Sequence, residues 1–171
     1  MRVVRAASEI FAEQGIRASV AEVAARAGVG NATVYRSYPS KDDLLAEVAL
    51  TWLGDIEVAA QQAAAAADPV VALTELVETV FEHLRGDRLA ADLLREGNLT
   101  SVIADTRRRV EGLWTTALRR AAAAGAVRGD VTYSDLSVLI LGTAERLTEL
   151  GITDQAAWQR MAGFVRAAIA S

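Results

Sequence analysis

Apolar residues recur along this chain at the three- and four-residue spacing that places them on one face of an α-helix. The first such stripe contains Val3, Val4, Ala7, Ile10 and Phe11. No segment shows the strict alternation that is typical of a half-buried strand. The pattern predicts an all-α fold of about nine helices, over residues 3–14, 19–27, 31–37, 41–67, 69–85, 89–96, 99–124, 133–149 and 154–170.

Capping residues support these boundaries. Ser19 is followed three positions later by Glu22, which is the spacing of a capping box at the start of a helix. Thr132 and Asp135 have the same spacing before the eighth helix. Thr153 is expected to cap the last helix.

Composition narrows the classes of function. The chain has 171 residues, of which 52% are hydrophobic and 23% are charged, as in an ordinary folded protein. It has no Cys and only one His, which excludes disulfides, thiolate metal sites and His-rich metal clusters. Because no Gly-rich phosphate loop or nucleophile motif is present, we expect no metal, no cofactor and no enzymatic activity.

No apolar run approaches the roughly 18–20 residues that span a membrane. No signal peptide precedes the first predicted helix. A cytoplasmic protein without a membrane partner is expected.

Charge is distributed unevenly. The net charge is −4, which alone argues against a nucleic-acid-binding protein. Residues 1–41, however, hold six Arg or Lys and three Asp or Glu, whereas residues 42–171 hold 12 and 19. A basic N-terminal segment on an acidic remainder indicates that nucleic-acid binding, if present, belongs to the N-terminus.

Residues 19–38 read SVAEVAARAGVGNATVYRSY and predict a helix-turn-helix. The small Ala24 allows the two short helices to cross closely, and Gly28 can adopt the positive φ that the turn requires. Val29 and Val34 are expected to lie in the core behind the second helix. The residues at the start of that helix are then free to project outward.

These projecting residues are candidates for reading DNA. An α-helix fits the major groove, where Asn31 can form paired hydrogen bonds with adenine. Ala32 and the methyl group of Thr33 can contact a thymine methyl, and Tyr35 can reach a phosphate. Lys41, the only lysine of the chain, can hold another phosphate at the start of the fourth helix. The alternative is that this segment is a surface helix of a plain bundle.

Residues 3–47 resemble the N-terminal part of the TetR family of bacterial transcriptional regulators. The matching elements include FAEQG at 11–15, AGV at 27–29, TVY at 33–35 and YPSK at 38–41. The resemblance implies a DNA-binding domain over residues 1–46, called the head, and a helical ligand-binding and dimerisation domain over residues 47–171, called the body. It also implies a homodimer on a palindromic, double-stranded DNA operator. The candidate DNA-binding residues are Ser19, Gly30, Asn31, Ala32, Thr33, Tyr35, Arg36 and Lys41.

The chain departs from the family pattern in two ways. Gly30 stands where the family usually has Ser or Thr, and Gly is a weaker helix cap. Only Arg2 and Arg5 represent the basic tail that usually precedes the first helix, so either the sequence is trimmed or DNA affinity depends on the head alone.

Large side chains in the body are few, and they either line an apolar ligand cavity or fill an alanine-rich core. An arginine such as Arg109 or Arg146 could hold an acidic ligand, or could pair with Glu145 or Glu149. A role for the lone histidine as a metal ligand is disfavoured because no second His or Cys exists. The candidate ligand-binding residues for a small-molecule effector are Trp52, Phe81, His83, Arg109, Leu113 and Trp114.

The last two predicted helices are apolar beyond a single stripe, which requires two packing neighbours. The rest of the chain supplies one, and a partner subunit in a two-fold dimer would supply the other. The candidate dimer-interface residues are Leu136, Leu139, Ile140, Thr143, Leu147, Trp158, Met161, Val165 and Ala168.

The sequence therefore predicts a homodimeric repressor that a small molecule releases from its operator, with the fourth helix as the lever between head and body. Two alternatives remain open. One is a family member that activates transcription or responds to a protein partner. The other is a helical small-molecule carrier or enzyme whose N-terminus only resembles a helix-turn-helix.

Overall fold

The computed structural model describes residues 2–90, 92 and 101–171. In that part of the chain the secondary structure consists of eight α-helices and one 3-10 helix, without a strand, and the all-α prediction is confirmed. The elements are α1 (Arg2–Gln14), η1 (Gly15–Arg17), α2 (Val20–Ala27), α3 (Asn31–Ser37), α4 (Lys41–Ala65), α5 (Pro69–Leu84), α7 (Ser101–Ala123), α8 (Tyr133–Glu149) and α9 (Gln155–Ile169).

The predicted helix over residues 89–96 lies mostly outside the described residues. Residues 88–90 and 92 are helical. The predicted start of the next helix at residue 99 is also outside the described part, and α7 is described from Ser101 onward.

The predicted capping boxes form. The backbone N–H of Ser19 donates to Glu22 Oε2 at 2.7 Å, and Thr132 with Asp135 makes the equivalent pair of contacts. The prediction that Thr153 caps the last helix was wrong. Asp154 is the cap, because its carboxylate accepts a hydrogen bond from the backbone N–H of Ala157 at 2.9 Å and α9 begins one residue later.

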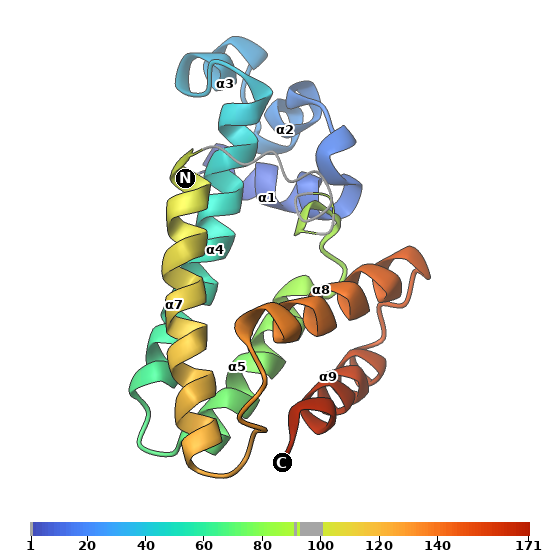
Figure 1. Cartoon of the computed structure of the whole chain (residues 1–171). Helices are drawn as coiled ribbons and strands as arrows, with labels where there is room; N and C mark the ends of the chain where they lie inside the picture. The colour runs from blue at the N-terminus through green and yellow to red at the C-terminus, as the bar shows by residue number, and fades with distance from the viewer. Residues whose placement is uncertain (1, 91, 93–100) are drawn as a thin grey trace.

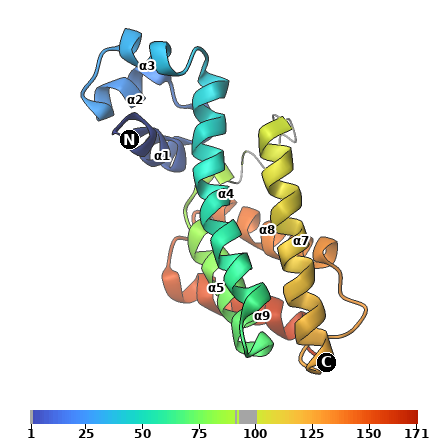
Figure 2. The ribbon, with the colours of Figure 1, turned by 90° about the vertical axis from the view of Figure 1, so that its left-hand side faces the viewer.

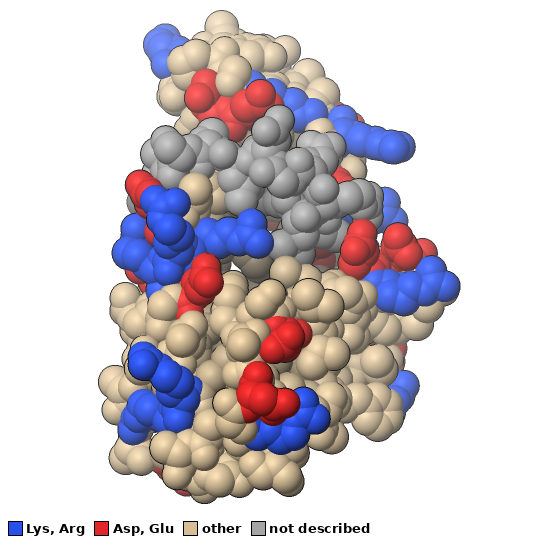
Figure 3. Space-filling view, viewed as in Figure 1, with Lys and Arg blue, Asp and Glu red and all other residues tan. Residues whose placement is uncertain are grey.

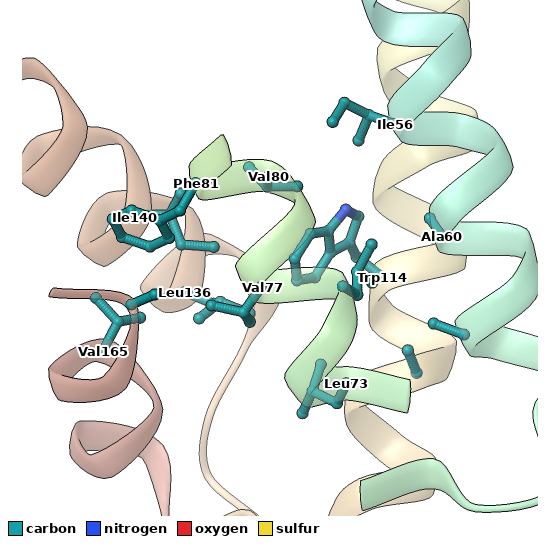
Figure 4. Close-up of a cluster of buried hydrophobic side chains, with 14 of the residues drawn as sticks. Ile56, Ala60, Leu73, Val77, Val80, Phe81, Trp114, Leu136, Ile140 and Val165 are labelled. Atoms are coloured by element: carbon teal, nitrogen blue, oxygen red, sulfur yellow. The ribbon is translucent and has the colours of Figure 1, made fainter. Parts of the chain in front are cut away.

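Two separate hydrophobic cores hold the chain together. The core of the head joins α1, α2, α3 and the start of α4, with Phe11, Val23, Val34 and Leu44 fully buried. The core of the body joins α5, α7, α8 and α9 to the later part of α4. Figure 1 shows the head at one end of the molecule and α4 running from it into the body, and Figure 4 shows side chains of the body core meeting from α4, α5, α7, α8 and α9.

Helices α4 and α7 lie side by side along much of their length (Figures 1 and 2). Arg109 on α7 forms a paired contact with Glu57 on α4, at 2.8 Å from Nε to Oε1. Arg120 on α7 donates to the carbonyl of Ala64 at 2.8 Å, which satisfies a carbonyl at the end of α4. These contacts tie the long connecting helix to the body, one near its middle and one at its C-terminal end.

Over the described residues, no helix combines the length and apolarity required to cross a membrane. The same residues include no group of three His, Cys, Asp or Glu side chains arranged to hold a metal ion.

Candidate DNA-binding head and body cavity

The turn between α2 and α3 has the geometry that the sequence predicts. Gly28 ends α2 with φ 69°, a left-handed conformation that suits glycine. The backbone N–H of Val29 donates back to the carbonyl of Ala24 at 3.0 Å. The chain then turns sharply, and α3 begins directly after Gly30.

Helix α3 places one residue inward and several outward. Val34 is fully buried in the head core. Asn31, Ala32, Tyr35 and Arg36 are exposed, and Tyr35 as a whole residue is 47% exposed although it is large and aromatic. Thr33 is half-buried. Figure 1 shows α3 at the outer end of the head, far from α8 and α9, where a DNA duplex can approach it.

Three other candidate DNA-binding residues have structural contacts in the head. The hydroxyl of Ser19 accepts from the backbone N–H of Glu22 at 3.3 Å, and the hydrogen bonds from Ser19 hold the pKa of the Glu22 carboxyl below its usual value. Gly30 caps α3 without a side chain. The ammonium of Lys41 donates to the backbone carbonyl of Ile16. Lys41 therefore joins the start of α4 to η1.

A cavity of about 100 Å³ lies in the body, between α4, α5, α7 and α8. Trp52 and Trp114, two of the predicted ligand-binding residues, line it. The lining is mostly apolar, and the remaining residues come from all four helices and the segment around residue 90. They are Ala49, Leu53, Ile56, Val80, Ala90, Ile103, Arg107, Val110, Tyr133, Leu136, Ser137, Ile140 and Leu141.

The other four predicted ligand-binding residues do not line this cavity. Phe81 is buried in the core, where its ring packs edge-on against Trp158 at a centroid distance of 6.1 Å. His83 Nδ1 lies 2.8 Å from the carbonyl of Thr79, on a polar groove between α5 and α9. Arg109 is held outside by its ion pair, and Leu113 packs half-buried against the core. Ligand binding by these four residues stays a prediction, because their positions on the helices face other neighbours than this cavity.

The sequence analysis missed the polar residues of the cavity. Arg107 lies seven residues before Trp114, and Val110 lies between them, so all three share one face of α7. That spacing was a usable signal. Tyr133 and Ser137 form the equivalent pair at the start of α8, one turn apart.

The polar groups at the cavity are mainly hydrogen-bond donors. Trp52 Nε1 is buried and has no hydrogen-bond partner among the described residues. Burial raises the pKa of the Tyr133 hydroxyl, while the nearby charge of Arg107 lowers it. The rings of Tyr133 and Trp114 lie 6.5 Å apart.

The dimer-interface prediction requires correction. Five of its members are at most 7% exposed within a single chain and belong to the body core, which makes them unavailable to a partner. They are Leu136, Ile140, Leu147, Trp158 and Val165. Leu139, Thr143 and Met161 are half-buried and Ala168 is exposed, so these four stay candidates. The predicted set does not include the exposed apolar side chains of Val138, Leu150 and Phe164, which are 68%, 55% and 59% exposed.

Comparison with known proteins agrees with the geometry of the head. Residues 3–48 match the family described as bacterial regulatory proteins, tetR family. Residues 68–168 match the C-terminal domain of the SbtR-like transcriptional regulators. An uncharacterized HTH-type transcriptional regulator of Mycobacterium tuberculosis is 31% identical over 94 residues, which make up 54% of this chain and 48% of the relative. The chain thus spans about half the length of the curated relatives that it matches.

Solved structures share the whole fold. The TetR family regulator PfmR of Thermus thermophilus superposes with a TM-score of 0.73 at 21% identity, covering 98% of each chain. The regulator FadR of Bacillus subtilis, solved in complex with stearoyl-CoA, gives a TM-score of 0.72 at 23% identity and covers 98% of this chain and 95% of that one. At these identities the similarity shows the fold alone.

A helix-turn-helix head with an outward α3, joined to an all-helical body, defines a DNA-binding transcriptional regulator. Both parts of the chain match a regulator family. The chain belongs to the TetR family.

Proposed function

We propose that this chain is a homodimeric repressor that binds a palindromic DNA operator and leaves it when a small molecule occupies the body. In this proposal residues 1–46 bind DNA, and residues 47–171 bind the ligand and the second subunit. The observation that supports it most is the exposed face of α3, with Asn31, Ala32, Tyr35 and Arg36 turned away from the core. The protein would act in the cytoplasm, through binding and without catalysis.

The proposed DNA contacts divide into two kinds. Asn31, Ala32 and Thr33 read base edges in the major groove. Tyr35, Arg36 and Lys41 contact phosphates and orient the head, with Ser19 and Gly30 close to the backbone. Arg36 supports this role because it is exposed and forms no ion pair with any described residue.

The proposed dimer joins α8 and α9 of two subunits in a four-helix interface. Val138 and Phe164 carry the largest exposed apolar surfaces of the two helices, and Leu139, Thr143, Met161 and Ala168 flank them. Figure 3 supports this choice, since the surface over α8 and α9 on the viewed face is mostly uncharged. Several exposed apolar side chains gathered into one patch on a folded protein mark an interaction surface, whereas a single one does not.

The proposed lever is α4. It contributes Leu44 to the head core and Trp52 and Ile56 to the cavity, so one rigid helix connects both. A ligand that fits better when α4 is displaced would shift the population of dimers away from the spacing that DNA requires. That a structurally similar regulator was solved in complex with stearoyl-CoA supports a small-molecule ligand for this chain.

Two measurements test this proposal. Sedimentation equilibrium at micromolar concentration should give a dimer, and Phe164→Glu should give a monomer with unchanged helicity. Transcription in vitro from a promoter that overlaps the bound DNA sequence should fall when the protein is added. A rise in transcription would instead indicate an activator, and a monomeric wild-type protein would contradict the dimer.

A further inference from the structure

We propose that the body cavity binds a compact apolar carboxylate, with its ring or short chain among the apolar side chains and its acid group at Arg107. This inference rests on the proposed function only in taking the cavity as the effector site. It adds the chemical class of the ligand.

The size of the cavity limits the ligand. An apolar cavity of about 150 Å³ holds benzene, and this one measures about 100 Å³. Its walls include Ile56, Val80, Val110 and Ile140, whose side chains offer no hydrogen bonds. A single ring or a short chain is therefore the upper limit for this cavity and already requires a small widening between its walls, and a larger ligand requires the helices to separate.

The polar groups at the cavity are hydrogen-bond donors, so the ligand should carry a hydrogen-bond acceptor. An indole nitrogen is a donor only, and Trp52 Nε1 is buried without a partner among the described residues. Figure 4 shows the indole nitrogen of Trp114 directed toward Ile56, and both residues line the cavity. The hydroxyl of Tyr133 can donate as well, whereas that of Ser137 already donates to the carbonyl of Ser134 at 2.8 Å. A ligand with acceptor oxygens can accept from the Tyr133 hydroxyl at the cavity wall, whereas Trp52 Nε1 has almost no accessible surface and requires a small movement of its ring to donate.

The positive charge of Arg107 favours a ligand whose hydrogen-bond acceptor is an anion. Arg107 is the charged residue of the cavity wall, and none of the described lining residues is Asp or Glu. The two arginines that follow it are already paired, Arg108 with Asp105 and Arg109 with Glu57. Arg107 forms no ion pair with a described residue, and because it is exposed as well as lining, it lies where the cavity meets solvent. A carboxylate there gains charge-assisted hydrogen bonds without burying the full charge.

Calorimetry and tryptophan fluorescence on the full chain test this inference with two matched pairs of probes, benzoate against benzamide and hexanoate against hexanamide. Within at least one pair the acid should bind about tenfold more tightly than its neutral amide, as expected for one hydrogen-bonded charge. Arg107→Met should remove this preference and leave binding of the amide unchanged. Arg108→Met is the control and should keep the preference, and thermal unfolding should show that both variants are folded.

The inference is overturned if each amide binds as well as its acid, if neither acid binds at millimolar concentration, or if Arg107→Met keeps the preference. DNA binding is measured separately on the same preparations. Loss of the acid preference with intact DNA binding rejects only the ligand class. An intact acid preference in a protein that binds no DNA rejects the proposed function and leaves the ligand class standing.

Discussion

The carboxylate of Asp92 accepts a hydrogen bond from the backbone N–H of Ile16 at 3.0 Å, across 76 positions of the chain. This contact holds Asp92, and with it the nearby residues Leu89 and Ala90, against the 3-10 turn of the head. Leu89 is buried in the head core, and its neighbour Ala90 lines the body cavity. A displacement of Leu89 and Ala90 would therefore change both the packing of the head core and the shape of the body cavity.

Gly15 makes the close approach of Asp92 feasible. Its φ is +70°, and a Cβ added there would lie 2.0 Å from Asp92 Oδ2. We expect Gly15→Ala to lower the free energy of unfolding by at least about 1–2 kcal/mol, the cost of left-handed backbone alone. Urea denaturation measures this. Gly129→Ala is the control and should unfold like the wild type. The φ of Gly129 is not positive, and a Cβ added there would have no other atom within 4 Å beyond its chain neighbours.

Leu89 should be as important to the head as the residues of α1–α3. It is 3% exposed, and Leu→Ala at a buried site costs about 2–5 kcal/mol. We expect Leu89→Ala to destabilise the chain by that amount and to weaken DNA binding. Val71→Ala truncates an apolar side chain on α5 that is 50% exposed and lies outside α8 and α9, and it should change stability by less than about 0.5 kcal/mol. Equal effects in the two variants would contradict the placement of Leu89.

The sequence predicted the head far better than the body. The capping box of Ser19, the positive φ of Gly28 and the burial of Val34 are local consequences of residues a few positions apart, so short-range rules suffice. In the body the same periodicity shows that one face of a helix is buried but not against which neighbour. Trp158 was therefore assigned to a dimer interface although the chain itself buries it completely. Arg109 was likewise assigned to the cavity, because its partner Glu57 lies 52 residues away in sequence.

Asp87 should make stability depend on pH. Burial raises the pKa of its carboxyl, although the backbone N–H groups of Ala90 and Leu89 and the nearby His83 lower it. The folded chain then binds a proton more tightly than the unfolded chain, so this group favours folding below its unfolded pKa and loses that contribution as the pH rises through its folded pKa. Asp87→Asn should be more stable than the wild type at pH 7, and chemical denaturation should show this difference shrinking toward pH 4. A difference that grows as the pH falls would contradict the assignment.

Lys41 should contribute to DNA affinity without contributing to sequence preference. Each phosphate contact adds about 0.9 to the slope of log affinity against log salt. We expect Lys41→Met to weaken binding to all duplexes alike and to reduce that slope by about 0.9 per head, as measured by fluorescence anisotropy between about 0.05 and 0.2 M salt. Arg128→Met, on the far loop between α7 and α8, is the control. Because Lys41 also contacts the Ile16 carbonyl, the melting temperature of each variant is measured first.

Selection of bound sequences from random duplex DNA tests the central claim most directly, namely that the exposed face of α3 reads sequence in a symmetric dimer. The wild-type chain should enrich a palindrome whose half-sites lie about one helical turn apart, roughly 34–36 Å. Asn31→Ala should still bind DNA and should lose preference at one symmetric position in each half-site. If the wild type enriches no sequence, or if Asn31→Ala enriches the same palindrome with the same strength, α3 does not read DNA as proposed.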